Sequence, residues 1–172
     1  MEGKPTAIAN IKAVKDVLEE VVDTESTRLI VEPGSAIIGS AVDFHTSVVD
    51  SKDTSQSSIV TTDGSRINID PLWAKDHYTY RVERQKEEKK PVEKQVICGY
   101  TCMDHDRIMT LSEEQKLYRG DRIIYEKVGA YSLTFGGPFI RYFPEVYVRQ
   151  KQSLEKVRKR ISVEEYYGMQ TL

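Results

Sequence analysis

Two cysteines and a neighbouring histidine form the first group of residues in this sequence that could do chemistry. Cys98, Cys102 and His105 have the spacing C-x3-C-x2-H, which would supply half of a zinc site. A structural zinc ion takes four ligands, usually from two close pairs, and the remaining histidines, His45 and His77, are isolated in the sequence. We therefore expect no metal site. Two cysteines are also too few for a disulfide framework, so each is either a reactive thiol or a small apolar side chain.

An acid and a phenol form a second group. Glu32 directly follows the apolar run Leu29-Ile30-Val31 and precedes Pro33-Gly34. An acid at the end of a buried strand is more often a site residue than a surface residue, because buried carboxylates need a partner. Tyr131 follows Gly129-Ala130, and it could supply a hydroxyl to a ligand or be one of ten tyrosines that fill a core. These residues need a scaffold to position them.

The N-terminal part of the sequence predicts one helix followed by one strand. Between Thr6 and Val22 the apolar residues recur at helical spacing, with Thr6 as a candidate N-cap. Arg28 to Val31 is a short apolar run of the kind that forms a strand buried on both faces, and Pro33-Gly34 ends it. One helix and one buried strand are a single repeat of an α/β fold, which cannot bury its own faces.

The rest of the sequence predicts a mostly antiparallel β domain. Residues 59–62 and 66–69 flank Asp63-Gly64, which is a hairpin signal. The other expected elements are a strand over 42–49, an exposed loop over 83–94, a strand over 95–101, a turn at 120–121 before a strand over 122–125, a last strand over 145–148, and a terminal helix over 153–166 capped by Ser153. We expect the strands to form a barrel or a sandwich.

The overall composition excludes several classes of protein. Apolar residues make up 39 % and charged residues 30 %, as in ordinary globular domains. The net charge of −2 gives no field that would attract nucleic acid, and the basic run 149–160 is expected to be the solvated face of the terminal helix. No apolar run approaches the length of a membrane span, and no signal peptide follows Met1. We expect a cytoplasmic protein without nucleic-acid or membrane partners.

Four short segments carry a joint signal. They are Glu32-Pro33-Gly34, the run 98–106 with Gly99, Cys102 and Asp106, the pair Gly120-Asp121 followed by Gly129-Ala130-Tyr131, and the glycine-containing turn from Phe135 to Phe139. Each motif alone is weak. In this order and spacing they resemble the E-P-G-R, G-x-x-C-[DE]-x-x-D, G-D…G-A-Y and F-N-G-F motifs of the diaminopimelate, ornithine and arginine decarboxylases. This family has an alanine-racemase-like fold.

The resemblance implies a fold, a cofactor and a set of site residues. It implies a C-terminal β-barrel or sandwich domain over residues 42–172, preceded by a remnant of the last part of a β/α barrel over residues 1–41. The implied cofactor is pyridoxal 5′-phosphate, the substrate an amino acid such as diaminopimelate, ornithine or lysine, and the assembly a homodimer with composite active sites. The implied cofactor-binding residues are Glu32, Gly34, Ser35 and Tyr131, and the implied substrate-binding residues are Met103, Asp104, Asp106 and Phe139.

Cys102 is implied to be the catalytic residue. After carbon dioxide leaves, the substrate carbon must be protonated, and an ordinary thiol is still mostly protonated at neutral pH. In the family this cysteine comes from the neighbouring subunit. Asp106 either caps its own loop or helps to shape the site near Cys102, while Cys98 is expected to be a small apolar side chain. We expect Cys102 and Tyr131 to converge on one pocket for a phosphorylated ring.

The sequence departs from the family's pattern in three respects. Ser35 stands where the family has an arginine, so it brings a hydroxyl but no charge, and Met103 replaces an acid that meets the substrate's distal amino group. The lysine that forms the Schiff base has no counterpart in these 172 residues. We therefore expect an active-site-closing and dimer-forming portion of a carboxy-lyase that is inactive alone. The alternative is a non-catalytic, decarboxylase-like β module that binds or regulates a partner enzyme.

Overall fold

The computed structural model describes residues 7–23, 25–75, 77–86 and 90–170. Three α-helices, two short 3-10 helices (η) and eight strands follow one another along these residues. In chain order they are α1 (Ala7–Glu19), α2 (Ser35–Ile38), η1 (Gly39–Ala41), β1 (Phe44–Asp53), β2 (Ser58–Thr62), η2 (Arg66–Asn68), β3 (Thr79–Glu83), β4 (Pro91–Cys98), β5 (Arg107–Gln115), β6 (Arg122–Glu126), β7 (Val146–Gln150), β8 (Ser153–Arg158) and α3 (Val163–Gln170). The candidate N-cap Thr6 lies outside the described residues.

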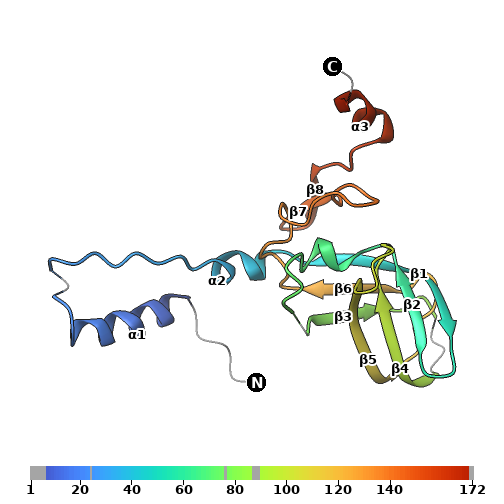
Figure 1. Ribbon diagram of the computed structural model, residues 1–172, viewed down its shortest axis with the longest axis horizontal. Helices are drawn as coiled ribbons and strands as arrows, with labels where there is room; N and C mark the ends of the chain where they lie inside the picture. The colour runs from blue at the N-terminus through green and yellow to red at the C-terminus, as the bar shows by residue number, and fades with distance from the viewer. Residues whose placement is uncertain (1–6, 24, 76, 87–89, 171–172) are drawn as a thin grey trace.

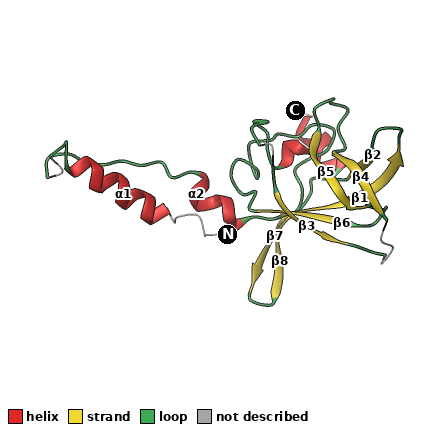
Figure 2. Ribbon diagram, turned by 90° about the horizontal axis from the view of Figure 1, so that it is seen from below, coloured by secondary structure: helices red, strands yellow, loops and turns green. Residues whose placement is uncertain are grey.

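Six strands form one curled sheet in the order β3-β6-β1-β2-β4-β5, and β7 and β8 form a separate hairpin (Figures 1 and 2). Neighbouring strands of the six-stranded sheet are antiparallel except β2 and β4, which are parallel. Side chains connect the two edge strands: Tyr80 of β3 donates a hydrogen bond to Glu114 of β5. Arg84, just after β3, donates to the carbonyl oxygens of Gln115 and Lys116 at the end of β5. The fold is therefore mainly β, an open half-barrel, as the resemblance implies.

One face of the sheet forms the core. In β2 the residues alternate between buried and partly buried, so Val60 points inward from the centre of the strand. Ile97 of β4 and Ile123 of β6 are also fully buried in the same cluster. Each such aliphatic side chain contributes about 1.5–3 kcal/mol by leaving water. This core holds the strand ends from which the loops of the candidate site emerge.

The N-terminal segment lies apart from the sheet. In both views α1 is separated from the β domain by an extended stretch that leads to α2 (Figures 1 and 2). The helix confirms the expected periodicity over 6–22 to within a few residues at each end. Ile8, Val14 and Val17 are all at least half exposed. The apolar face of α1 therefore has no cover within the described chain.

The strand expected over residues 28–31 is wrong. These residues are extended but belong to no strand, and Ile30 is 72 % exposed. A strand of this kind needs hydrogen-bonded neighbours on both sides, and the described residues supply none. The acid at position 32 is therefore exposed as well.

The hairpin expected around Asp63-Gly64 is wrong in its second half. β2 pairs with β1 and β4, while Arg66–Asn68 forms η2 in place of a strand. Ser65 and Asn68 form a capping box. The Ser65 side chain accepts a hydrogen bond from the Asn68 backbone, and the Asn68 side chain accepts one from the Ser65 backbone N–H. These local hydrogen bonds compete successfully with strand pairing.

Two further elements differ from expectation. Residues 153–158 form β8 and not part of a helix, because they pair with β7 across a tight turn in which Lys151 has φ 53°. The helix begins only at Val163, and the basic run 149–160 lies mostly on the hairpin.

The expected loop over 83–94 is also shorter, because Pro91 to Lys94 belong to β4. By contrast, the strands expected over 42–49 and 122–125 are confirmed as β1 and β6. The strand expected over 95–101 is confirmed as far as Cys98, where β4 ends.

Candidate functional site

The Cys102 loop, residues 99–106, connects β4 to β5. The Cys102 side chain is exposed, Met103 is partly buried and Asp104 is exposed. The structure thus brings Cys102 and three of the predicted substrate-binding residues into one short loop. Burial raises the pKa of the Cys98 thiol at the end of β4, which leaves Cys102 as the more accessible of the two sulfurs.

Asp106 holds this loop in shape. Its buried carboxylate accepts four hydrogen bonds: from the Ser65 hydroxyl at 2.9 Å, from the Arg66 backbone N–H at 2.8 Å, and from both the backbone N–H and the hydroxyl of Thr101. Gly99 lies against the same carboxylate, where an added Cβ would come within 2.2 Å of Oδ2. Asp106 therefore ties the loop to η2, a contact that fits either of the roles expected for it.

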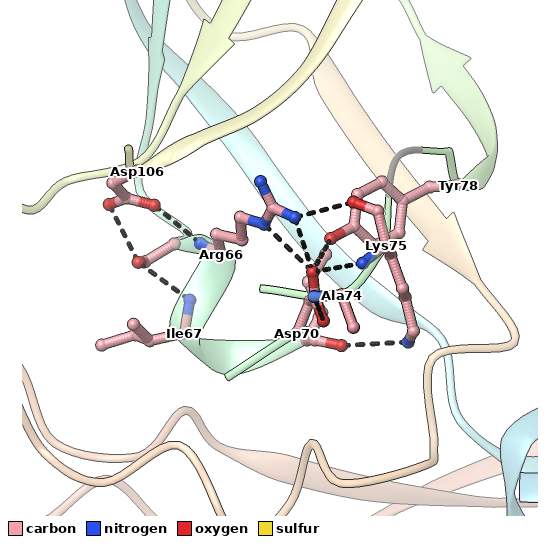
Figure 3. A network of polar contacts seen from close by, with 9 residues as sticks. Arg66, Ile67, Asp70, Ala74, Lys75, Tyr78 and Asp106 are labelled. Atoms are coloured by element: carbon pink, nitrogen blue, oxygen red, sulfur yellow. Dashed lines mark hydrogen bonds and ion pairs between the residues drawn. The ribbon is translucent and has the colours of Figure 1, made fainter. Parts of the chain in front are cut away.

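A second buried carboxylate, Asp70, organises the segment after η2 (Figure 3). Its oxygens accept hydrogen bonds from the Arg66 guanidinium, from the backbone N–H groups of Ala74 and Lys75, and from the Tyr78 hydroxyl. Burial alone would raise the pKa of Asp70, but these donors outweigh it and lower the pKa below its usual value. Burial also raises the pKa of Tyr78 well above the ordinary phenol range.

Arg66 joins the two carboxylates. Its backbone N–H binds Asp106 and its guanidinium binds Asp70 (Figure 3), at 2.9 Å from Nη2 to Oδ2. The guanidinium also lies over the Trp73 ring, 5.2 Å from its centroid. Trp73 in turn meets His105 of the Cys102 loop edge-on, with ring centroids 4.6 Å apart. The loop that bears the thiol is therefore fixed at two points, by Asp106 and by the ring contact.

Trp73 has a left-handed backbone, with φ 55°. This conformation is rare for a bulky residue and costs on the order of 1–3 kcal/mol. The hydrogen bond from Trp73 N–H to the Asp70 carbonyl, together with the Asp70 carboxylate contacts, holds it there. Sequence reasoning missed Asp70, Arg66 and Trp73, because residues 66–69 were expected to be a strand. The Ser65–Asn68 spacing was the signal that could have shown the capped turn.

The predicted cofactor-binding residues lie on two segments that touch. Glu32, Gly34 and Ser35 are exposed at the start of α2, and Gly34 has φ 46°. The segment continues to Gly39, whose carbonyl accepts a hydrogen bond of 3.0 Å from the Gly129 N–H. A Cβ at position 129 would come within 2.1 Å of a backbone oxygen of this segment, so only glycine permits the contact. The G-A-Y motif therefore contacts the short helical segment that follows the E-P-G motif.

Tyr131 follows directly on this contact. It is 58 % exposed, and its ring meets the Phe135 ring edge-on. Phe139, the remaining predicted substrate residue, is also exposed and forms an isolated bridge with Arg141.

No hydrogen bond or ring contact among the described residues joins Cys102 to Tyr131. The two groups of predicted residues, one around each of them, thus occupy separate loops of this chain. Their convergence on one pocket stays a prediction, because the resemblance implies that the thiol serves the neighbouring subunit.

The residues predicted to hold pyridoxal phosphate are of the right chemical type. A phosphate dianion is bound by hydroxyls, backbone N–H groups and cations. Tyr131 and Ser35 present hydroxyls on exposed, adjacent segments, and Gly34 exposes its backbone. The described residues contain no group of three or more His, Cys, Asp or Glu side chains arranged to hold a metal ion. Within the same part of the chain, no helix has the length and apolar character needed to cross a bilayer.

Comparison with known proteins gives one family. Residues 14–129 match the family model described as the C-terminal sheet domain of pyridoxal-dependent decarboxylases. No curated protein sequence gives a significant match.

Solved structures share the fold. Diaminopimelate decarboxylase from M. jannaschii superposes with a TM-score of 0.77 and 21 % identity over 99 % of this chain and 40 % of that chain. The Helicobacter pylori enzyme, complexed with L-lysine, gives 0.74 and 20 % identity over 98 % of this chain and 41 % of that chain. Arginine decarboxylase of Paramecium bursaria Chlorella virus, bound to agmatine, gives 0.61 and 17 % identity over 72 % and 34 %.

The chain spans about two fifths of the length of the diaminopimelate decarboxylase structures. At these identities the superpositions show a shared fold, while the family model covers well over half of the chain. The chain belongs to the pyridoxal-dependent decarboxylase family, and it contains that family's C-terminal sheet domain.

Proposed function

We propose that this chain is the active-site-closing and dimer-forming C-terminal portion of a pyridoxal-phosphate-dependent amino-acid decarboxylase. Family membership over residues 14–129 is the observation that carries the proposal. The exposed thiol of Cys102, on a loop held by the buried Asp106 carboxylate and by the contact between His105 and Trp73, supports it. The proposed substrate is an amino acid, because the related structures are of amino-acid decarboxylases, one of them complexed with L-lysine.

Tyr131, Ser35 and the backbone at Gly34 hold the cofactor's phosphate in this proposal. When bound, pyridoxal phosphate supplies the electron sink that makes loss of carbon dioxide from an amino acid possible. The chain's own contribution is binding and orientation. The close contact between Gly129 and the segment after Gly34 brings the two phosphate-binding segments together. Glu32, exposed beside them, is proposed to face the ring.

Cys102 delivers the proton that replaces carbon dioxide. Its Sγ lies on an exposed loop, so it can reach a site that a second copy of the chain closes. This geometry suits a homodimer with composite sites, in which Met103, Asp104 and Phe139 contact the substrate. Asp106 acts as a positioning residue, because its carboxylate is fully engaged within the chain. We place this protein in the cytoplasm.

The chain alone is proposed to be inactive, because none of its lysines matches the one that forms the Schiff base in the family. The test incubates the purified chain with pyridoxal phosphate and a panel of amino acids, including lysine and ornithine, and measures carbon dioxide release. No release is expected. The DNA upstream of Met1 is then read for a continuous frame that encodes a glycine-rich loop and a lysine.

A non-catalytic module is the second candidate. Two observations favour it: Ser35 brings no charge to the cofactor segment, and Met103 brings no acid to the thiol loop. The same upstream sequence separates the candidates, since a genuine start site at Met1 favours the module. Carbon dioxide release by the isolated chain would contradict both candidates, because each of them requires that the chain alone be inactive.

A further inference from the structure

A small cavity lies where the sheet meets the C-terminal segments. Its walls come from the start of β1, the turn after β2, the Cys102 loop and the segments on either side of the β7–β8 hairpin. Its volume is about 50 Å³, and it is partly open to solvent. The residues predicted for cofactor or substrate binding do not line it, so the function proposed above does not account for it.

The charged groups around this cavity are mostly cations. Arg141 and Arg160 line it, together with His45 and one acid, Asp63. The Asp63 carboxylate already accepts a hydrogen bond of 2.7 Å from the Ser47 backbone N–H.

Arg141 is held in place and still has donors to offer. Its guanidinium lies over the Tyr100 ring, 4.9 Å from the centroid, which fixes the plane of the fork. Within the described chain it donates one hydrogen bond, of 3.2 Å, to the Asp63 backbone carbonyl. A guanidinium has five N–H donors in a rigid fork, so this single bond leaves most of them for another acceptor.

Arg160 also lines the cavity. Its exposed side chain forms no hydrogen bond or ion pair within the described residues. Its charge acts on the Glu145 carboxylate, but that carboxylate already binds Lys156 and the Tyr147 hydroxyl. Arg160 therefore lacks a dedicated counter-ion in this chain.

Tyr100 adds a neutral donor to the wall of the cavity. Burial raises the pKa of its phenol, although a hydrogen bond with Asn68 and the charges of Arg141 and Arg160 act in the opposite direction. The phenol therefore keeps its proton at neutral pH. Asn68 is itself buried, and its side chain accepts a hydrogen bond from the Ser65 backbone N–H.

We propose that this cavity is a binding site for a small oxyanion, a carboxylate or a phosphate group, held between Arg141 and Arg160. The guanidinium fork matches the planar arrangement of oxygens in such groups. A volume of about 50 Å³ leaves room for an oxyanion group such as a carboxylate or a phosphate. This proposal does not depend on the proposed decarboxylase function, because the site is formed only by residues of the described chain.

The test titrates the 172-residue chain with inorganic phosphate and, separately, with acetate, at constant ionic strength. Binding is followed by the amide resonances of Tyr100 and Arg141 in heteronuclear NMR spectra. We expect saturable shifts with at least one of the two anions. Saturation by phosphate alone assigns the site to phosphates, saturation by acetate alone to carboxylates, and saturation by both to oxyanions in general.

Variants identify the residues responsible. Arg141→Gln and Arg160→Gln should each weaken binding by about tenfold or more, since each removes a charge-assisted donor. Arg149→Gln is the matched control, because Arg149 is an exposed arginine on β7 that does not line the cavity. Arg141 and Arg160 are both exposed, so both variants should fold, and Arg160→Gln removes no hydrogen bond within the described residues.

Two results would overturn the proposal. One is the absence of saturation with either anion. The other is equal affinity in the wild-type chain, Arg149→Gln and Arg160→Gln, which would reveal non-specific attraction to surface charge.

Discussion

Replacing Asp106 by asparagine tests whether this carboxylate holds the Cys102 loop. Asparagine keeps the shape but turns one acceptor oxygen into an NH₂ donor. If Oδ1 is replaced, the new group faces the Arg66 N–H, which now lies 2.8 Å from that atom. If Oδ2 is replaced, it faces the Thr101 N–H and two hydroxyls. At least one backbone N–H therefore loses its acceptor in either orientation.

The expected loss of stability follows from these contacts. A hydrogen bond to a charged group contributes about 1.5–3 kcal/mol, and a buried donor without a partner costs about 1–3 kcal/mol. The hydroxyls of Ser65 and Thr101 can rotate to accept from the new amide, which recovers part of the cost. We expect Asp106→Asn to lower the free energy of unfolding by about 2–4 kcal/mol.

Urea unfolding followed by tryptophan fluorescence measures this loss directly. Trp73 is the only tryptophan in the sequence, and it contacts His105 of the same loop. Asp104→Asn is the matched control, since Asp104 is an exposed acid in that loop and should change stability by less than about 0.5 kcal/mol. Equal unfolding midpoints for Asp106→Asn and Asp104→Asn would refute the role assigned to Asp106.

Three further predictions concern other contacts. Gly129→Ala should destabilise by about 1–3 kcal/mol, because its Cβ would overlap the backbone oxygen of Ile38 at the end of α2, and thermal unfolding measures this. Hydrogen bonds lower the pKa of Asp70 in the folded protein below its usual value of 3.8. The stability that Asp70 contributes is therefore fully present above pH 3.8 and is lost as the pH falls through the folded-state pKa. Urea unfolding midpoints measured from neutral to acid pH should show this loss. Alkylation by iodoacetamide, followed by mass spectrometry, should modify the exposed Cys102 well before Cys98, whose pKa burial raises.

A different result would contradict each of these three predictions. Gly168→Ala, in α3, has open space for a Cβ and is the control for Gly129→Ala; equal destabilisation of the two would argue against the close contact. An Asp70→Asn variant with the same acid sensitivity as the wild type would remove Asp70 as the cause. Faster labelling of Cys98 than of Cys102 would contradict the exposure of the loop.

The strands that the sequence predicted correctly are those with local signals. β6 follows the Gly120-Asp121 turn and reads Ile123-Ile124-Tyr125, all of them buried. Motif order also singled out the Cys102 loop and the segments at 32–35 and 129–131, whose role in cofactor binding stays a prediction. The Asp70 cluster could not be predicted in the same way, because it depends on contacts of Arg66 and Tyr78 that become visible only when the chain is folded.

The mistaken elements have a common physical cause. Residues 28–31 have the composition of a buried strand, but a strand exists only with hydrogen-bonded neighbours. Residues 66–69 have strand-like composition, but the Ser65–Asn68 capping box and the Asp106 carboxylate bind their backbone first. Residues 153–158 carry charges on both sides, and pairing with β7 decides their conformation. Tertiary partners override local preference in all three segments.

The central claim is that the Cys102 thiol donates the proton in an amino-acid decarboxylase. The most direct measurement is the kcat for carbon dioxide release by the protein translated from the complete reading frame around this chain, compared between wild type, Cys102→Ala and Cys98→Ala. We predict a fall of about 10²–10⁴-fold for Cys102→Ala, as expected for loss of a general acid, with cofactor absorbance retained and Cys98→Ala close to wild type. An unchanged kcat in Cys102→Ala would contradict it.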